Sequence, residues 1–502
     1  MPAGQPDIDV LIVGAGISGI GMAAHMEMMC PDHSYAIIER REVIGGTWDL
    51  FRYPGIRSDS DMHTLGFVFE PWKHEKAIAD GPSILDYLNR IADERGISPH
   101  IRFGHKVLSA DFLPDRGYWQ VTAETADGER KLITARFLYL GSGYYDYDDP
   151  YDAGFDFSAY RGQVVHPQFW PEDLDYAGKR VVVVGSGATA VTLVPAMADK
   201  AASVTMLQRT PTWMFSHPAK DAIANFLRKI LPEKLAYALT RFKNIRMQDF
   251  AFKTARKRPE RVKERLLERI EKSLGPEFDA QAFTAPYNPW DQRLCLVPDD
   301  DLFEAMKNGK ARVVTGHIER FEANGVRLKS GELLEADIIV TATGLRLAVA
   351  GKIALSLAGE PIDFARHYYY KGCMFSNIPN LAVVFGYLNA SWTLRADINS
   401  EFVCRLLNHM RQAGADVATP VLTREAEAAL VDDDVFDFSS GYIQRSKHIM
   451  PRNANAYPWR LNQEYVVDRK VMRQGAIDDG VLAFTRAGDD ASMRQERLEA
   501  AE

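Results

Sequence analysis

The sequence is poor in cysteine, in long apolar runs and in excess positive charge. It has four Cys in 502 residues and no CxxC pair, so a zinc or disulfide framework is not expected. No run reaches the roughly 18 apolar residues of a membrane-spanning helix, and Asp7 and Asp9 stand where a signal peptide carries positive charge. With 60 Lys/Arg against 68 Asp/Glu, the net charge is −8, which argues against a nucleic-acid partner. These absences predict a cytoplasmic protein with no membrane span, nucleic-acid partner or metal site.

Two segments repeat one pattern. Residues 8–40 and residues 179–209 each show a strand, a glycine-rich turn, a helix and a second strand. Strands that alternate with helices favour parallel sheets. The sequence therefore predicts an α/β fold with two Rossmann-like dinucleotide-binding domains.

The first glycine-rich turn is residues 14–19 (GAGISG). Such glycines allow a tight turn, a close approach of the backbone to a pyrophosphate and close packing of helix on strand, and the helix N-terminus supplies N–H donors. Glu39 ends the next strand 25 residues after Gly14, where a carboxylate can accept hydrogen bonds from ribose hydroxyls. The residues expected to contact this nucleotide are Gly14, Gly16, Ser18, Gly19 and Glu39.

The second turn is residues 185–190 (GSGATA), and no acidic residue ends its second strand. Arg209 stands there instead, where an arginine can pair with a 2′-phosphate and so favours NADPH over NADH; a plain surface arginine is the alternative. One ribose carboxylate and one phosphate-seeking arginine together suggest FAD and NADPH in one chain. The contacts expected here are Gly185, Ser186, Gly187, Thr189, Arg209 and Thr210.

Further motifs resemble class B flavoprotein monooxygenases. Residues 45–61 (GGTWDLFRYPGIRSDSD) resemble their flavin-contacting segment, and residues 160–171 (YRGQVVHPQFWP) resemble the FxGxxxHxxxW fingerprint of type I Baeyer–Villiger monooxygenases. Residues 287–298, 390–393 and 458–463 are similar to the subgroup that includes the mycobacterial enzyme activating thioamide prodrugs. The resemblance implies flavin contacts from Gly46, Thr47, Trp48, Asp49, Tyr53 and Asp59. The fingerprint positions are Tyr160 (in place of Phe), Gly162, His166, Trp170 and Pro171.

The resemblance also implies roles for individual residues. Arg293 matches the arginine that stabilises the peroxyflavin anion beside the flavin, and Asp59 matches the carboxylate that hydrogen-bonds and orients that arginine. An arginine suits this task because it stays charged under all relevant conditions. His166 matches a linker histidine with a conformational role, and Gln292 replaces a lysine that often helps hold the 2′-phosphate, which weakens the NADPH preference.

A substrate pocket is expected near the flavin. Tyr387, Asn389 and Trp392 follow the return of the chain toward the cofactor and are candidates for its lining. Core packing is the alternative interpretation for Trp392.

Three domain segments follow from these motifs. Residues 1–145 and 345–502 are expected to form the FAD-binding domain, and residues 146–344 the NADPH-binding domain with a helical insertion near 215–290. Within it, residues 228–272 hold 15 Lys/Arg against 6 Asp/Glu. A solvated helical face is the simpler interpretation, and attraction to an anionic membrane surface is the alternative.

The predicted function is a Baeyer–Villiger monooxygenase. It would use NADPH, FAD and O2 to convert a ketone to an ester or lactone through a C4a-peroxyflavin, and it would also oxidise sulfides. A flavin N- or S-monooxygenase shares every fold feature, but such relatives usually carry Tyr or Phe at the position of Trp170. A disulfide reductase would need a redox cysteine pair, and a nucleotide-sensing protein would have no use for Arg293 and Asp59. The substrate and the oligomeric state stay open.

Overall fold

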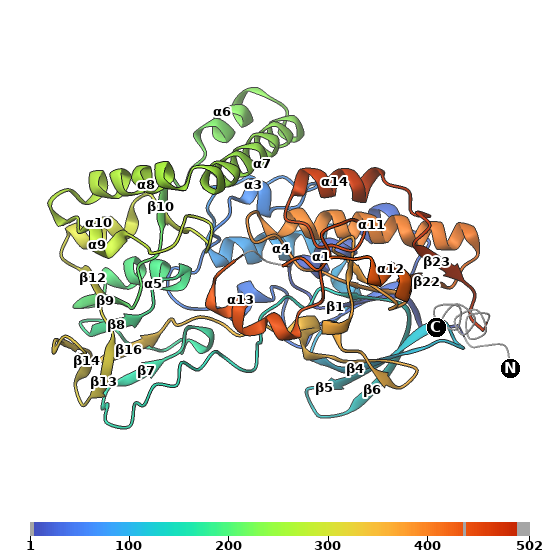
Figure 1. Cartoon of the computed structure of the whole chain (residues 1–502), viewed down its shortest axis with the longest axis horizontal. Coiled ribbons are helices and arrows are strands. Elements are labelled where there is room, and N and C mark those ends of the chain that lie inside the picture. The colour runs from blue at the N-terminus through green and yellow to red at the C-terminus, as the bar shows by residue number, and fades with distance from the viewer. Residues whose placement is uncertain (1–4, 435–437, 489–502) are drawn as a thin grey trace.

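The chain is built around two sheets that lie side by side (Figure 1). A computed structural model describes residues 5–434 and 438–488. One sheet has nine strands in the order β18-β17-β4-β5-β6-β1-β2-β3, with β21 also pairing with β6. The other has five strands in the order β12-β9-β8-β16-β7. The expected α/β fold is confirmed.

The first sheet has a parallel core of β1 between β2 and β6. Its strands are β1 (Ile8–Val13), β2 (Tyr35–Ile38), β3 (Ile101–Arg102), β4 (His105–Leu113), β5 (Tyr118–Thr125), β6 (Arg130–Leu140), β17 (Ala354–Leu357), β18 (Glu360–Pro361) and β21 (Leu381–Val383). Helices from the same part of the chain are α1 (Ile17–Met29), α2 (Thr47–Leu50), α3 (Met62–Leu65) and α4 (Gly81–Glu94).

Strand β1 is buried on both faces, because its side chains alternate between two cores. Val10 and Ile12 belong to the core that contains α1 and α11 (Trp392–Ala413). Leu11 and Val13 belong to the core on the opposite face. This double burial explains why the strand is a continuous apolar run rather than an alternating one.

The five-stranded sheet is entirely parallel. Val181 and Val183 of β8 pack in a core with α5 and α10, and Val182 packs on the other face with a three-stranded antiparallel sheet. The strands are β7 (Gln163–Val165), β8 (Arg180–Val184), β9 (Ser203–Gln208), β12 (Ala311–Thr315) and β16 (Ile338–Thr341), and those of the small sheet are β13 (Ile318–Glu322), β14 (Gly325–Leu328) and β15 (Leu333–Glu335).

The basic region near residues 215–290 is helical, as expected, but it is broken into pieces. Pro232 precedes α7, and Pro259 is the first residue of α8; proline is well tolerated only at such starts. The helices here are α6 (Ala222–Ile230), α7 (Glu233–Lys257), α8 (Pro259–Leu274) and α9 (Ala280–Phe283). Helix α5 (Ala188–Ala198) precedes this region and α10 (Asp301–Lys307) follows it, and β10 (Met214–His217) pairs with β11 (Cys295–Pro298).

The C-terminal part returns to the first sheet. Strands β17 and β21 join β4 and β6, and α11 packs against α1. Arg241 of α7 ties the helical insertion to this part, because its guanidinium lies 3.1 Å from the Asp397 carboxylate of α11 and donates to the Gly66 carbonyl at 2.7 Å. The remaining elements are β19 (Tyr369–Tyr370), β20 (Met374–Phe375), β22 (Val417–Pro420), β23 (Leu482–Thr485), α12 (Arg424–Ala428), α13 (Gly441–Ser446) and α14 (Tyr465–Gln474).

Candidate active site

A cavity of about 320 Å³ lies at the carboxyl end of β1, where ligands bind in open α/β sheets. Its lining comes from many parts of the chain: the turn into α1, residues 38–40, residues 45–60, Leu65, residues 105–107, residues 141–148, residues 188–189, Arg293, residues 345–353 and residues 387–392. Of the sequence-predicted residues, those in its wall are Gly14, Gly16, Ser18, Glu39, Gly46, Thr47, Trp48, Tyr53, Asp59, Thr189, Arg293, Tyr387 and Trp392.

The glycines of the first motif are required by close backbone contacts. Gly14 has φ +100°, and a Cβ there would lie 2.8 Å from the Gly141 carbonyl oxygen. A Cβ on Gly19 would lie only 1.8 Å from the Gly14 carbonyl oxygen. Gly16 begins α1 without any side-chain cap, so the first N–H groups of the helix are available to an anionic ligand.

Glu39 is fixed at the end of β2 by two backbone donors. Its Oε2 accepts from the Ala15 N–H at 2.7 Å, and its Oε1 accepts from the Arg41 N–H at 2.8 Å. Burial raises the pKa of this carboxyl, and the two backbone hydrogen bonds oppose that rise. Each carboxylate oxygen retains a lone pair with which it can accept a ribose hydroxyl.

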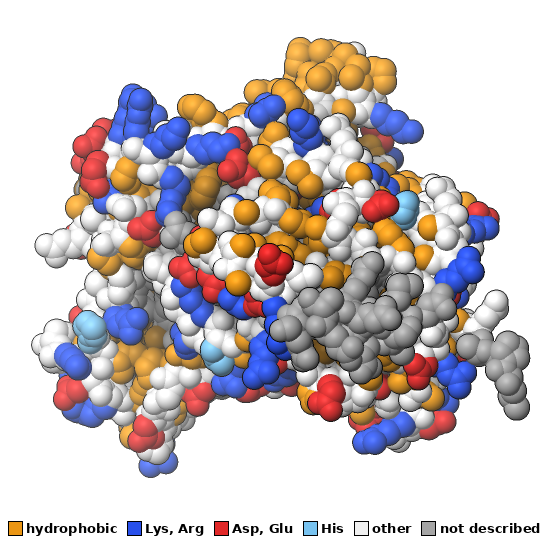
Figure 2. Space-filling view, turned by 45° about the vertical axis from the view of Figure 1, so that its right-hand side comes forward, with side chains coloured by type: hydrophobic (Ala, Val, Ile, Leu, Met, Phe, Trp, Pro, Cys, Tyr) orange, Lys and Arg blue, Asp and Glu red, His pale blue; other side chains and the backbone are white. Residues whose placement is uncertain are grey.

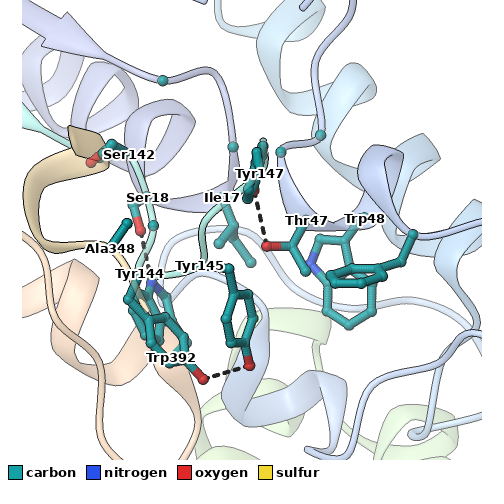
Figure 3. A pocket seen from close by; sticks show the side chains of 18 of the residues that line it. Ile17, Ser18, Thr47, Trp48, Ser142, Tyr144, Tyr145, Tyr147, Ala348 and Trp392 are labelled. Carbon is teal, nitrogen blue, oxygen red and sulfur yellow. Dashed lines mark hydrogen bonds between the residues drawn. The ribbon is translucent and has the colours of Figure 1, made fainter. Parts of the chain in front are cut away.

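An aromatic wall that the sequence motifs did not reveal lines one side of the cavity (Figure 3). The rings of Tyr144 and Trp392 stack with centroids 5.0 Å apart, and the Tyr144 and Tyr145 hydroxyls are 2.6 Å apart. Trp392 donates to the Ser18 hydroxyl at 2.8 Å. Residues 142–147 contribute five polar side chains to the cavity wall but match no nucleotide-binding pattern; only their place after a buried strand could have indicated them.

A flavin dinucleotide fits this lining. The uncapped start of α1 and the carboxylate of Glu39 suit a pyrophosphate and a ribose. The hydroxyl of Ser142, which also lines the cavity, is buried without a hydrogen-bond partner, so a bound ligand could satisfy it. The flat aromatic wall suits a planar ring system.

Arg293 places a cation in the cavity wall. Its Nε donates to the Leu388 carbonyl at 3.3 Å. Burial lowers the pKa of Arg293, but Tyr144 and Asp59 outweigh it and the guanidinium stays charged. Burial raises the pKa of Asp59, against the opposing influence of Arg293 and Arg57. Among the described residues no hydrogen bond or ion pair links Asp59 to Arg293, although both line the cavity and each influences the pKa of the other. The direct bond stays a prediction.

Within residues 45–61, Asp49 is oriented away from the expected contact. Its carboxylate is tied to Arg41 Nε at 2.7 Å and also pairs with Arg52. Thr47 bonds to the Tyr147 hydroxyl at 3.1 Å in the cavity wall. Asp49 therefore orients two arginines next to the site rather than lining it.

The second motif repeats the geometry of the first at α5. Gly185 has φ +139°, and a Cβ there would lie 2.2 Å from the Ala342 carbonyl oxygen. A Cβ on Gly187 would meet nothing within 4 Å, and Ser186 donates to the Thr210 carbonyl at 3.0 Å. Arg209 is exposed directly after β9 and has no ion-pair partner in the described part of the chain.

Gln292 and Arg209 have different surroundings in the structure. Its Nε2 is 3.4 Å from the Ser439 hydroxyl, next to α13. Within residues 5–434 and 438–488 no contact links it to a phosphate-binding group, so its expected role stays a prediction.

The fingerprint segment contains β7, an edge strand of the five-stranded sheet, and does not line the cavity. The Tyr160 hydroxyl donates to the Ala336 carbonyl at 3.0 Å, and a Cβ on Gly162 would lie 2.5 Å from the Asp337 carbonyl oxygen. His166 Nδ1 accepts from the Gln168 N–H at 3.2 Å, and burial lowers the pKa of this histidine. Trp170, followed by Pro171, lies in a shallow depression beside the loop that ends β6.

Of the three candidates for substrate contacts, two line the cavity and one does not. The Tyr387 and Trp392 rings line the cavity, although the Tyr387 hydroxyl is bound to Asp468 at 2.8 Å. Asn389 is not in the cavity wall, and its Nδ2 donates to the Gln463 carbonyl at 2.9 Å.

In residues 5–434 and 438–488, no cluster of three or more His, Cys, Asp or Glu could hold a metal ion.

Two sheets with parallel cores, each with a glycine-rich turn that leads into an uncapped helix, define a flavoprotein oxidoreductase with two dinucleotide sites. The family of pyridine nucleotide-disulphide oxidoreductases matches residues 11–264. The chain is 50% identical over 482 residues to the FAD-containing monooxygenase EthA of Mycobacterium tuberculosis, covering 95% of this chain and 98% of that protein. It is 47% identical over 493 residues to the probable FAD-binding monooxygenase AlmA of Acinetobacter baylyi, covering 98% of each.

Solved structures share the fold. A steroid monooxygenase bound to NADP superposes with a TM-score of 0.77 at 20% identity, covering 95% of this chain and 99% of that one. A cyclohexanone monooxygenase bound to ε-caprolactone superposes with a TM-score of 0.72 at 20% identity, covering 95% and 99%. The chain belongs to the family of FAD-containing monooxygenases, and the resemblance seen in its motifs is confirmed.

Proposed function

We propose that this protein is an NADPH-dependent Baeyer–Villiger monooxygenase. It would convert a ketone, O2, NADPH and a proton into an ester or lactone, NADP+ and water. The observation that carries the proposal is the partly buried guanidinium of Arg293 in the wall of the cavity at the carboxyl end of β1. The names of the structural neighbours, one bound to NADP and one to a lactone, support it.

The two sheets would divide the cofactors. Residues 1–145 and 345–502 would hold FAD through the α1 turn, Glu39 and the wall of the cavity. Residues 146–344 would hold NADPH through the α5 turn, with Arg209 toward the 2′-phosphate. When bound, FAD would supply the redox chemistry, which is hydride uptake from NADPH and activation of O2.

Arg293 would stabilise negative charge that develops on oxygen beside it. A fixed cation in a site shielded from water is worth far more than one in bulk solvent, because little screening opposes it. Asp59 would balance this cation across the cavity. The stacked rings of Tyr144 and Trp392 would exclude water from the reacting atoms.

Product analysis under ¹⁸O2 tests the proposal. The purified holoenzyme is given NADPH with a cyclic ketone, a linear methyl ketone or an aryl methyl sulfide. We expect an ester or lactone that contains one ¹⁸O atom, with one NADPH consumed per product. Protein boiled before the assay controls for chemical oxidation by hydrogen peroxide.

A flavin N- or S-monooxygenase is the second candidate. Exclusive formation of the sulfoxide, with no ester from either ketone, would favour it and refute the Baeyer–Villiger assignment. Formation of both products would support the proposed ability to oxidise sulfides in addition to ketones.

A further inference from the structure

Helices α6 and α7 form a protruding hairpin with an apolar outer surface. Of the 17 large hydrophobic side chains that are exposed in the described residues, eight lie on these two helices. Their exposed fractions run from 44% to 72%. They are Ile223, Phe226, Ile230, Leu235, Leu239, Phe242, Met247 and Phe250. Figure 2 shows an orange knob at the top of the molecule, where Figure 1 places α6 and α7.

These side chains share faces of their helices. Ile223, Phe226 and Ile230 are spaced three and four residues apart on α6, and Leu235, Leu239 and Phe242 have the same spacing on α7. Such spacing places each set along one side of a helix. Contiguous exposed apolar surface of this kind marks an interaction site rather than ordinary surface.

The same hairpin is strongly basic. Residues 222–258 hold ten Lys/Arg against two Asp/Glu, whereas the whole chain has a net charge of −8. Lys229, Lys234, Arg246, Lys257 and Arg258 have no ion-pair partner within residues 5–434 and 438–488, and Arg246 lies over the ring of Phe242 at 5.5 Å. Free cations therefore flank the apolar side chains, an arrangement typical of helices that lie in a membrane interface.

The hairpin is anchored firmly on its inner side. The Tyr237 hydroxyl donates to the Phe67 carbonyl at 2.9 Å, and Lys243 of α7 pairs at 2.7 Å with Asp221, the N-cap of α6, so that this ion pair holds the two helices together. Buried Arg241 donates to the His63 carbonyl at 2.9 Å. The outer apolar side chains are thus held outward by a fixed base. They cannot reach the core without breaking these bonds.

We propose that the α6–α7 hairpin docks the enzyme on an anionic lipid bilayer. The apolar side chains would enter the boundary between headgroups and acyl chains, and the flanking cations would face anionic headgroups. The enzyme would lie on the surface and not cross it, since no helix in the described part of the chain could span a membrane. The charge favours lipid over a second copy of the chain, because two facing hairpins would bring like charges together.

Vesicle co-sedimentation of the FAD-loaded enzyme tests the docking. Vesicles of phosphatidylcholine alone are compared with vesicles that contain 30 mol% phosphatidylglycerol, at 50 mM and 500 mM NaCl. We expect binding to the anionic vesicles at least tenfold tighter than to the neutral ones, and weaker binding at high salt. Absence of binding to anionic vesicles at low salt would overturn the proposal.

Two triple variants locate the surface. Ile223→Gln, Phe226→Gln and Ile230→Gln remove the apolar side chains, and Lys229→Gln, Lys234→Gln and Arg246→Gln remove the charges; each set should weaken binding at least tenfold. Matched controls change exposed residues elsewhere. They are Val43→Gln, Leu132→Gln and Val431→Gln for the first set, and Lys200→Gln, Lys310→Gln and Lys329→Gln for the second.

Folding and self-association are checked in the same preparations. FAD content and NADPH oxidation should match the wild type in every variant, because none of these residues lines the cavity. If both control sets lose as much binding as the hairpin sets, the surface is wrong. If light scattering shows a wild-type dimer that becomes a monomer in the apolar variant, without vesicle binding, the face joins two copies instead.

Discussion

Gly19→Ala should destroy flavin binding while adding only one methyl group. The new Cβ would lie 1.8 Å from the Gly14 carbonyl oxygen, whereas real Cβ contacts are essentially never below 3.0 Å, so α1 must move by at least 1.2 Å. Alanine gains about 1 kcal/mol of helix propensity over glycine, but overpacking costs about 1–3 kcal/mol. The cost should fall at the upper end, because the contact is backbone and cannot rotate away.

The assay is the flavin-to-protein absorbance ratio together with thermal unfolding. We expect Gly19→Ala to purify with less than a tenth of the wild-type flavin and a clearly lower Tm. Gly21→Ala is the matched control on the same helix, since its Cβ would meet the buried Phe67 ring at 2.7 Å and not the backbone of the glycine-rich turn, so it should lower the Tm but keep the flavin. Wild-type flavin content in Gly19→Ala would refute the reasoning that this contact fixes the pyrophosphate turn.

Four further predictions follow from single side chains. Arg293→Ala should keep its FAD and still oxidise NADPH, releasing hydrogen peroxide, but lose at least about a hundredfold in ester formation; Arg293→Lys should retain more, and a near-normal ester yield in the alanine variant would contradict the assigned role. Arg209→Gln should raise KM for NADPH about tenfold, the size of one charged hydrogen-bonding contact, and leave KM for NADH unchanged, and an equal rise in both would argue against a 2′-phosphate contact. Burial lowers the pKa of His166, so its neutral form is favoured in the folded state and stability should fall as pH drops through about 6.5; the Tm advantage of the wild type over His166→Gln should therefore shrink between pH 8 and pH 5.5, and a difference independent of pH would contradict this. Arg241→Met removes the guanidinium from the buried Asp397 carboxylate, which keeps only the Val68 N–H at 3.0 Å and His25 at 3.4 Å, and should cost about 3–5 kcal/mol in chemical unfolding, whereas adding Asp397→Leu should restore part of that loss.

The parts of the fold that obey local rules could be predicted from the sequence. Both glycine-rich turns need backbone conformations and close contacts that glycine allows, so residues 14–19 and 185–190 are recognisable in the sequence. Each turn follows a strand of one of the two sheets, so each indicated one sheet. The helix starts at Pro232 and Pro259 follow from the same kind of local rule, although only one continuous helical region was expected there. The pairing of β21 with β6 could not be predicted, because it joins segments some 240 residues apart and no short pattern encodes it.

The site was predictable where family motifs exist and not elsewhere. Arg293 and Asp59 were found by resemblance, and both line the cavity. Asp49 shares the same motif, but its carboxylate is occupied by Arg41 and Arg52, which sequence spacing cannot reveal. The stacking of Tyr144 on Trp392 arises only when the C-terminal return meets the end of β6.

Because β21 is synthesised long after β6, with which it pairs, the two sheets can be completed at different times during translation. While β6 leaves the ribosome at residue 140, its neighbour that begins at residue 381 is still about 240 residues away, which is roughly 10–50 s at ordinary translation rates. Every strand of the five-stranded sheet, from residue 163 to residue 341, is made within that interval. The middle of the nascent chain can therefore complete its five-stranded sheet first. During that time the apolar face of α1 stays uncovered, because α11, which packs against it, has not yet been synthesised. A chaperone that recognises exposed apolar helices would find its substrate in that interval.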